Sequence, residues 1–167
     1  TSPPKEFAVN LGAPGDRRGP NGMMWFDQPS VGGNSPKLPV KIEGKSLRSV
    51  RHHMSRIENG DEALPWVTSS AVVGIKNLRQ ETPDGKQFTV RLHFAELEGL
   101  EPGERVFDVS IQGKRVLKSF DIAKEAGGTL RGTVKEFAGI TTDGTLNLSF
   151  SNEIGQACLS GVQLITE

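Results

Sequence analysis

A cluster of acidic residues follows the most regular apolar pattern of the chain and is the first candidate for chemistry. Paired carboxylates are the catalytic groups of glycoside hydrolysis, and their oxygen atoms are the ligands that calcium prefers. A Pro-Gly turn lies within the cluster and its spacing does not match an EF-hand loop, so we expect a solvated acidic loop instead. The cluster consists of Glu96, Glu98, Glu101 and Glu104.

The histidines and the cysteine are the candidates for a metal site. His52 and His53 are adjacent, and adjacent residues of a strand point to opposite faces, so they are not expected to share an ion. His93 occupies a polar position of a patterned strand and is expected to be a hydrogen-bonded sheet residue. Cys158 is the single cysteine, which excludes an intrachain disulfide. The sequence predicts no metal and no cofactor.

Catalytic motifs are absent from the sequence. It contains neither the G-x-S-x-G motif of a hydrolase nor the H-E-x-x-H motif of a metalloprotease. Gly44-Lys45-Ser46 is similar to the end of a phosphate-binding loop, but Pro39 replaces the glycine that such a loop requires. We therefore predict a protein that is not an enzyme and has no catalytic residues.

Aromatic side chains are the candidates for ligand contact, because an aromatic face stacks on the C–H face of a sugar. Trp25 lies beside Phe26 in a dense apolar cluster, and Trp66 follows Leu64-Pro65. Core burial is favoured for one of Trp25 and Phe26, whereas both a core role and a ligand role are open for Trp66. Residues 10–39 are rich in Gly, Pro and Asn, as in the long loops where a β-sandwich carries its binding surface.

Strands must position these side chains, because apolar residues recur at every second position of several segments. The pattern is clearest at 88–94, and a glycine-containing turn joins 106–111 to 115–120 as a hairpin. Further strands are expected near 146–150 and 162–164. The inward-facing side chains should share one core: Val90, Leu92, Phe94, Phe107, Val109, Ile111, Leu148, Phe150 and Leu164.

Helix is expected only at 122–126, with Asp121 as N-cap and Gly127-Gly128 after its end. Several short strands between turns are typical of a sandwich or a barrel. The 167 residues suit one domain, which we place at 6–167 after a linker remnant at 1–5. The chain is thus expected to be a module whose partners include other domains of the same parent chain.

Charge and hydropathy exclude two classes of partner. Twenty Lys and Arg balance twenty Asp and Glu, so no basic field exists to bind nucleic acid. No apolar run reaches the roughly 18 residues of a membrane-spanning helix, so no membrane insertion is expected.

Consecutive motifs resemble those of the malectin and malectin-like carbohydrate-binding domains. They are VRLHFAE at 90–96, RVFDVSIQGK at 105–114 and VLKSFDI at 116–122, with FAVNLG at 7–12 and SGVQLI at 160–165 near the two ends. The resemblance implies an all-β, jelly-roll-like sandwich of two antiparallel sheets with long loops and at most one short helix. It also implies a noncatalytic, extracytoplasmic domain.

Members of this family differ in what they bind. Malectin is associated with glucose-rich oligosaccharides, bacterial versions are attached to carbohydrate-active or other multidomain extracytoplasmic proteins, and plant versions in receptor kinases bind peptides and proteins. Residues 10–18 are similar to modules of large bacterial secreted proteins. The resemblance therefore implies a carbohydrate or a protein partner.

The sequence departs from malectin where that protein binds sugar. Malectin has a Tyr-Phe pair where this chain has Glu98-Gly99, and this chain contains no tyrosine. The loop that carries a binding acid in malectin offers Asn152-Glu153 here, and the upstream tyrosine loop corresponds to the region of His53 and Trp66.

We therefore predict a noncatalytic carbohydrate-binding module of a larger extracytoplasmic protein, with a gluco-oligosaccharide as ligand. The alternative is a protein or domain interaction module without sugar affinity. The predicted ligand-binding residues are Trp25, His53, Trp66, Glu98, Asn152 and Glu153.

Overall fold

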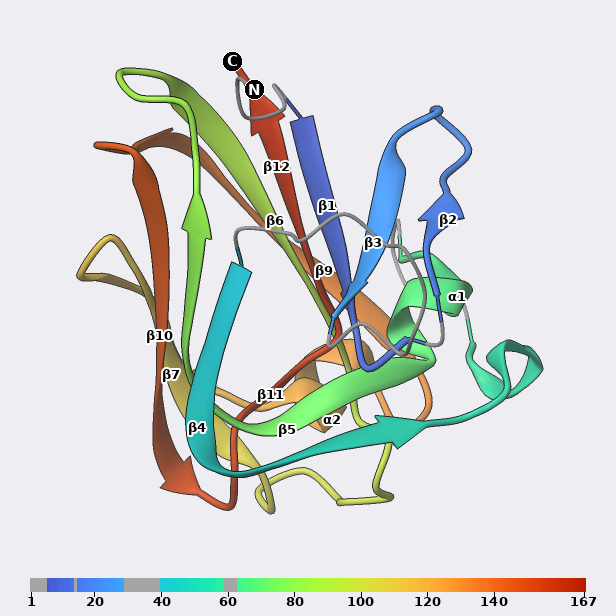
Figure 1. Cartoon of the computed structure of the whole chain (residues 1–167). Coiled ribbons are helices and arrows are strands. Elements are labelled where there is room, and N and C mark those ends of the chain that lie inside the picture. Colours follow the sequence, from blue (N-terminus) through green and yellow to red (C-terminus); the bar gives the residue numbers. More distant parts are fainter. Residues whose placement is uncertain (1–5, 14, 29–39, 59–62) are drawn as a thin grey trace.

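The computed structural model describes residues 6–13, 15–28, 40–58 and 63–167, so the predicted linker at 1–5 lies outside the described residues. Two sheets face each other across a shared core (Figure 1). The first sheet has the order β2-β3-β1-β12-β6-β9. Its strands are β1 (Glu6–Leu11), β2 (Arg17–Arg18), β3 (Met24–Gln28), β6 (Gln87–Ala95), β9 (Gly132–Thr141) and β12 (Gly161–Thr166).

The second sheet has the order β11-β5-β10-β7-β8, with β4 paired to β5. Its strands are β4 (Val40–Arg51), β5 (Ser70–Glu81), β7 (Val106–Ile111), β8 (Lys114–Phe120), β10 (Thr145–Ile154) and β11 (Cys158–Leu159). The sandwich and the hairpin of β7 and β8 confirm the expected fold class.

One strand pair departs from the expectation of purely antiparallel sheets. β1 and β3 are parallel, with Ala8 opposite Trp25. A parallel pair needs a connection of about a dozen residues or more. Here the connecting segment runs through β2, which returns antiparallel to β3.

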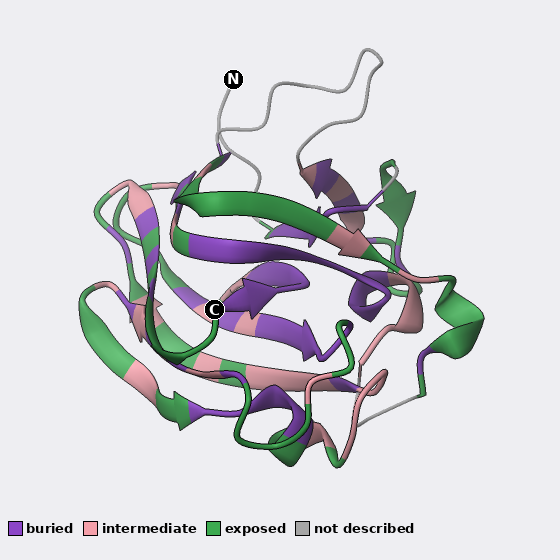
Figure 2. Ribbon diagram, turned by 90° about the horizontal axis from the view of Figure 1, so that it is seen from below, coloured by how far each residue is buried: buried purple, intermediate pink, exposed green. Residues whose placement is uncertain are grey.

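The predicted core residues all belong to one cluster of buried side chains between the sheets. Figure 2 shows the alternation along the strands, with buried segments between exposed ones. In β6, Val90, Leu92 and Phe94 face this core, so His93 points to the opposite face of the first sheet. That outer face is covered locally by a smaller apolar cluster, to which Trp25 and Val67 belong.

The described residues form more short helices than the one that the sequence predicted. α2 (Ile122–Ala126) follows the prediction, because the Asp121 side chain accepts from the backbone N–H of Lys124 and Gly127 ends the helix in the left-handed conformation. α1 (Pro65–Thr68) and the 3-10 helix η1 (Met54–Arg56) were not expected. Each is a single turn, which is too short to produce an apolar repeat in the sequence.

β4 and β5 bend together at Gly44 and Gly74; β4 runs from the bend toward α1, and the antiparallel β5 runs from α1 to the bend (Figure 1). A side chain at Gly44 would place its Cβ 2.0 Å from the carbonyl oxygen of Gly74, so only glycine allows this approach. The bend brings the end of β4 and the start of β5 beside α1 and the β1–β2 loop. These segments form the site described next.

Candidate functional site

A hollow of about 660 Å³ lies where the β1–β2 loop, the end of β4, η1 and α1 meet. We call it the Trp66 cleft. The lining residues used below are Asn10, Asp16, Arg17, Arg51, His53 and Trp66.

Trp66 is the aromatic wall of the cleft. α1 places its ring half-buried, in a T-shaped contact with Trp25 at a centroid distance of 5.3 Å and an interplanar angle of 82°. The guanidinium carbon of Arg17 lies 5.1 Å from the centre of the Trp66 ring, within the range of a cation–π interaction. The ring is therefore held from one side by a core residue and contacted by a cation.

Trp25 belongs to the support behind the cleft. It is 1% exposed, and its ring contacts the ring of His93 edge to face at 5.2 Å. Trp25 was predicted to be a ligand-binding residue, but its buried ring offers no face to a ligand in this structure. Its burial agrees with the core role that the sequence favoured for one of Trp25 and Phe26.

His93 is a hydrogen-bonded sheet residue, as expected. Its Nε2 lies 2.8 Å from Oε1 of Gln163, which can only accept, so Nε2 carries the proton. Burial lowers the pKa of His93 to about 4. Nδ1 has no hydrogen-bond partner among the described residues. The imidazole behind Trp25 is therefore neutral at neutral pH.

Asn10 joins the cleft to the core of the first sheet. Its Nδ2 donates to the backbone carbonyl of Trp66 at 3.2 Å, and its Oδ1 accepts from the hydroxyl of Ser70 at 3.3 Å. Asn10 is 3% exposed, so its amide holds α1 in place.

The adjacent histidines follow the end of β4 and have separate hydrogen-bond partners. His53 is the N-cap of η1, with Nδ1 2.7 Å from the hydroxyl of Ser55, whereas Nε2 of His52 lies 2.7 Å from the carbonyl oxygen of Leu97. Across the described ranges, no three His, Cys, Asp or Glu residues group in a way that could hold a metal ion.

Two arginines of the cleft are held by uncharged groups. Nε and Nη2 of Arg51 both donate to the carbonyl oxygen of Gly12, at 3.2 and 3.0 Å. Arg17 contacts the Trp66 ring and the Met54 sulfur. Within the described part of the chain, no carboxylate forms an ion pair with Arg17 or Arg51.

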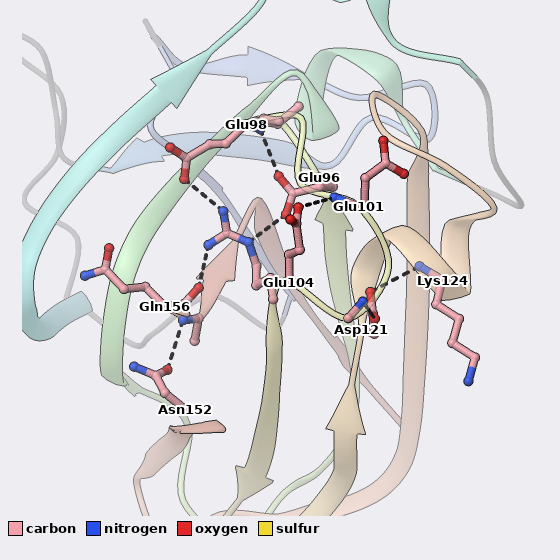
Figure 3. A network of polar contacts seen from close by, with 12 residues as sticks. Glu96, Glu98, Glu101, Glu104, Asp121, Lys124, Asn152 and Gln156 are labelled. Carbon is pink, nitrogen blue, oxygen red and sulfur yellow. Dashed lines mark hydrogen bonds and ion pairs between the residues drawn. The ribbon is translucent and has the colours of Figure 1, made fainter. Parts of the chain in front are cut away.

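Glu98 belongs to a different structure, an ion network around the buried Arg105. Figure 3 labels Glu96 and Glu98 of this network. Nε of Arg105 donates to Glu96 at 2.6 Å, and its Nη2 donates to Glu98 at 2.8 Å. Glu98 also accepts from Arg48, and this hydrogen bond is the main cause of its lowered pKa. We name these residues the Arg105 network: Glu96, Glu98, Arg48 and Arg105.

The expectation of a solvated acidic loop was wrong for Glu96. Its side chain is 1% exposed, because Arg105 neutralises it inside the protein. Glu101 and Glu104 are exposed, and the Glu104 carboxylate accepts from the backbone N–H of Glu101.

Asn152 and Glu153 lie at the end of β10. Oδ1 of Asn152 accepts from the backbone N–H of Ala157 at 2.9 Å, and Glu153 accepts from the Ser119 hydroxyl at 2.8 Å. Asn152 is drawn beside the Arg105 network in Figure 3 and lines a hollow other than the Trp66 cleft.

Of the predicted ligand-binding residues, the structure thus brings only Trp66 and His53 into one cleft, with Trp25 behind them. Sequence reasoning missed Arg17, Arg51 and Asn10. An Arg-Arg pair inside a glycine-rich segment was the one available signal for Arg17, whereas nothing in the local sequence marks Arg51.

The known proteins that this chain is similar to include proteins of a plant and of a bacterium. A family model described as the malectin domain matches residues 7–164. A probable leucine-rich repeat receptor-like serine/threonine-protein kinase of Arabidopsis thaliana is 42% identical over 67 residues, which are 36% of this chain and 7% of the kinase. A second such kinase is 36% identical over 67 residues, with the same coverage. The chain thus matches a small part of these curated relatives.

Solved structures match almost the whole chain. Bacteroides uniformis beta-glucuronidase has a TM-score of 0.74 at 23% identity, covering 97% of this chain and 18% of that chain. The ANXUR2 extracellular domain of Arabidopsis thaliana has a TM-score of 0.75 at 18% identity, covering 96% and 48%. A chain in the crystal structure of plant peptide RALF23 in complex with FER and LLG2 has a TM-score of 0.70 at 18% identity, covering 96% of this chain and 48% of that chain. At these identities, the likenesses show the fold alone. The similarity of residues 10–18 to bacterial modules predicts a bacterial source, but the matched proteins come from a plant and a bacterium and do not support that prediction.

Among the described residues, no helix is long and apolar enough to cross a membrane.

Proposed function

The chain belongs to the malectin domain family, and from this premise we propose that it is a noncatalytic module of a larger protein that binds carbohydrate in the Trp66 cleft. Membership places the domain outside the cytoplasm, as in the extracellular domain of ANXUR2. The chain covers 7% of the matched kinase, 18% of the beta-glucuronidase chain and 48% of the ANXUR2 chain, which supports a module within a larger parent chain.

The half-buried ring of Trp66 in a polar cleft is the observation that carries this proposal. A sugar site combines an aromatic platform with groups that hydrogen-bond the ring of hydroxyls. The cleft provides the indole together with the imidazole of His53 and the carboxylate of Asp16. The occurrence of the fold in a beta-glucuronidase is consistent with a role beside carbohydrate chemistry.

A hollow on the second sheet supports the choice of cleft, because its described lining residues include no stacking platform. A shallow hollow on that face is lined by Asn77, Arg79, Asn147 and other polar or aliphatic residues, without an aromatic ring among the described ones. Hydroxyl partners without a platform bind a sugar weakly, so the Trp66 cleft is the better site.

Titration of gluco-oligosaccharides against the wild type and Trp66→Ala tests the proposal. Losing one stacked aromatic removes an interaction of about 0.5–1.5 kcal/mol beyond its area burial, which corresponds to about 2- to 13-fold weaker binding. Ile154→Ala is the matched control, since Ile154 is 51% exposed and does not line the cleft. Unchanged affinity in a folded Trp66→Ala protein would remove the cleft from the proposal.

The proposal that the domain is noncatalytic rests on the ion pairs of its acidic cluster. Glu96 and Glu98 are committed to Arg105, so neither is poised as a free acid or base. We expect no turnover of chromogenic glycosides, esters or phosphates. Turnover that disappears in Glu96→Gln or Glu98→Gln would contradict this assignment.

The alternative function is binding of a protein or peptide on the same fold. One feature of the cleft favours it, because Arg17 covers a face of Trp66 that a neutral sugar would need. The match to a structure of a plant peptide in complex with FER and LLG2 gives further support. If a glycan array shows no saturable binding to the wild-type domain, this alternative replaces carbohydrate binding.

A further inference from the structure

We propose that the Trp66 cleft selects anionic saccharides, in which a sugar ring carries a carboxylate or a sulfate ester, and that Arg17 and Arg51 make this selection. The inference rests on the proposed function, since it names the class of carbohydrate that the same cleft would take.

The pairing of the arginines is the first observation. Arg48, Arg91, Arg105, Arg115 and Arg131 each form an ion pair with an Asp or Glu. The remaining arginines form none with the described residues, and Arg17 and Arg51 are the two of them that line the cleft. An unmatched pair of guanidinium groups in one concavity attracts an anion, because field lines concentrate there.

Arg51 is already positioned for such a ligand. Its Nε and Nη2 donate to the carbonyl oxygen of Gly12, which fixes the plane of the guanidinium group. Nη1 has no partner in the described part of the chain. A planar guanidinium held in this way can donate to a carboxylate or sulfate oxygen with little loss of side-chain freedom.

Arg17 connects charge selection to stacking on the ring. Its guanidinium group lies over Trp66, so a neutral sugar that stacks there displaces the cation and gives it no new partner. An anionic sugar presents an apolar C–H face and a negative group on the same ring. It can therefore take the Trp66 face and pair with the displaced Arg17.

The acidic and titratable groups of the cleft do not cancel this preference. Asp16 is the one carboxylate among the described lining residues, and its Oδ1 accepts from the backbone N–H of Asp27 at 3.0 Å. Two guanidinium groups stand against one carboxylate among the Arg, Lys, Asp and Glu residues of the described lining, which leaves an excess of one positive charge.

The experiment compares each anionic ligand with a neutral counterpart that has the same sugar backbone. Trigalacturonate and its methyl ester are titrated against the wild-type domain, and cellotriose 6-sulfate is titrated beside cellotriose. We expect each anionic ligand to bind at least about tenfold more tightly than its neutral partner, as one charge-assisted hydrogen bond provides. The preference should shrink as salt is added. A preference in only one pair tells whether the anion is a carboxylate or a sulfate.

Arginine variants assign the preference to the cleft. Arg17→Gln and Arg51→Gln should each lose most of the tenfold difference, and Arg17→Gln should bind the neutral ester as well as the wild type does, or more tightly. Arg79→Gln is the matched control, because Arg79 is exposed, forms no ion pair in the described part and lies outside the cleft.

Three results would overturn the inference. Equal binding of the charged and neutral partners through Trp66 would leave the proposed function standing without its charge selection. The same loss in Arg79→Gln as in Arg17→Gln would show a nonspecific attraction. If no saccharide of either kind binds, the proposed function fails as well.

Discussion

Arginines at two neighbouring places of this domain are used in opposite ways. In the Arg105 network, a guanidinium group that is 4% exposed contacts two carboxylates and the backbone carbonyl of Gln156. In the Trp66 cleft, Arg17 and Arg51 contact a ring, a sulfur and a carbonyl oxygen, with no carboxylate of the described residues paired to them. His52 lies between the two places, with its Nε2 at the carbonyl oxygen of Leu97.

The difference between the two sets of arginines follows from their burial. A buried charge must be matched within the protein, because an uncompensated one costs several kcal/mol. An exposed charge needs no such match, so it remains available for a ligand. The Arg105 network therefore stabilises the loop after β6, whereas the cleft arginines add little to stability and remain free to recognise an anion.

The largest expected effect is on the Arg105 network. Arg105→Met leaves Glu96 buried without its partner, and we expect the free energy of unfolding to fall by about 3–5 kcal/mol. Urea denaturation measures it. Arg115→Met is the matched control, because its pair with Asp108 is exposed and should contribute less than about 1 kcal/mol. Equal losses in the two variants would remove the distinction between buried and exposed pairs.

The next effect concerns His93, behind the cleft. Its folded pKa of about 4 lies below the ordinary 6.5, so the unfolded chain binds the proton more readily between these values. The contribution of neutral His93 to the free energy of unfolding is therefore fully present above pH 6.5. It is lost as the pH drops toward 4, which lowers the free energy of unfolding by about 3 kcal/mol.

Denaturation of the wild type and of His93→Gln at pH 7 and pH 5 measures this dependence, which should be weaker in the variant. The lowered pKa of Glu98 acts in a lower window, because its stabilisation is lost only as the pH falls below 4.5. A wild-type stability that is constant from pH 7 to pH 5 would show that His93 is not held neutral.

A smaller effect is expected from the cleft arginines themselves. Arg17→Met loses an exposed cation–π contact, and Arg51→Met loses hydrogen bonds to one carbonyl oxygen. Each variant should change the free energy of unfolding by no more than about 1 kcal/mol. Thermal melting beside Arg105→Met measures the contrast, and a loss as large as that of Arg105→Met would make the cleft arginines structural.

The smallest effect is the absence of thiol labelling at Cys158. The residue is buried in β11, and burial raises the pKa of its thiol to about 12, so a thiol reagent at pH 8 should not label the folded domain. Arg105→Met should speed labelling, because Arg105 also holds the carbonyl of Gln156 just before β11. Rapid labelling of the native wild type would show that this end of the sandwich opens readily.

The sequence by itself determined the sandwich, because its signals are local. Alternation placed the nine predicted side chains in one core, and the Asp121 cap with Gly127 set the bounds of α2. Motifs from 88 to 122 identified the family. The single-turn helix α1 and the parallel pair of β1 and β3 were beyond these signals, since neither produces a periodic pattern.

Only the tertiary structure decided which charges are paired and which remain open. Glu98 and Arg48 are 50 positions apart, and nothing near either residue in the sequence distinguishes this pair from the unpaired arginines. The bend at Gly44 and Gly74 carries Arg51 to the cleft, while α1 brings Trp66 under Arg17. Ion pairing depends on distances of a few ångströms between distant segments, so local pattern locates the strands but does not reveal which side chains meet.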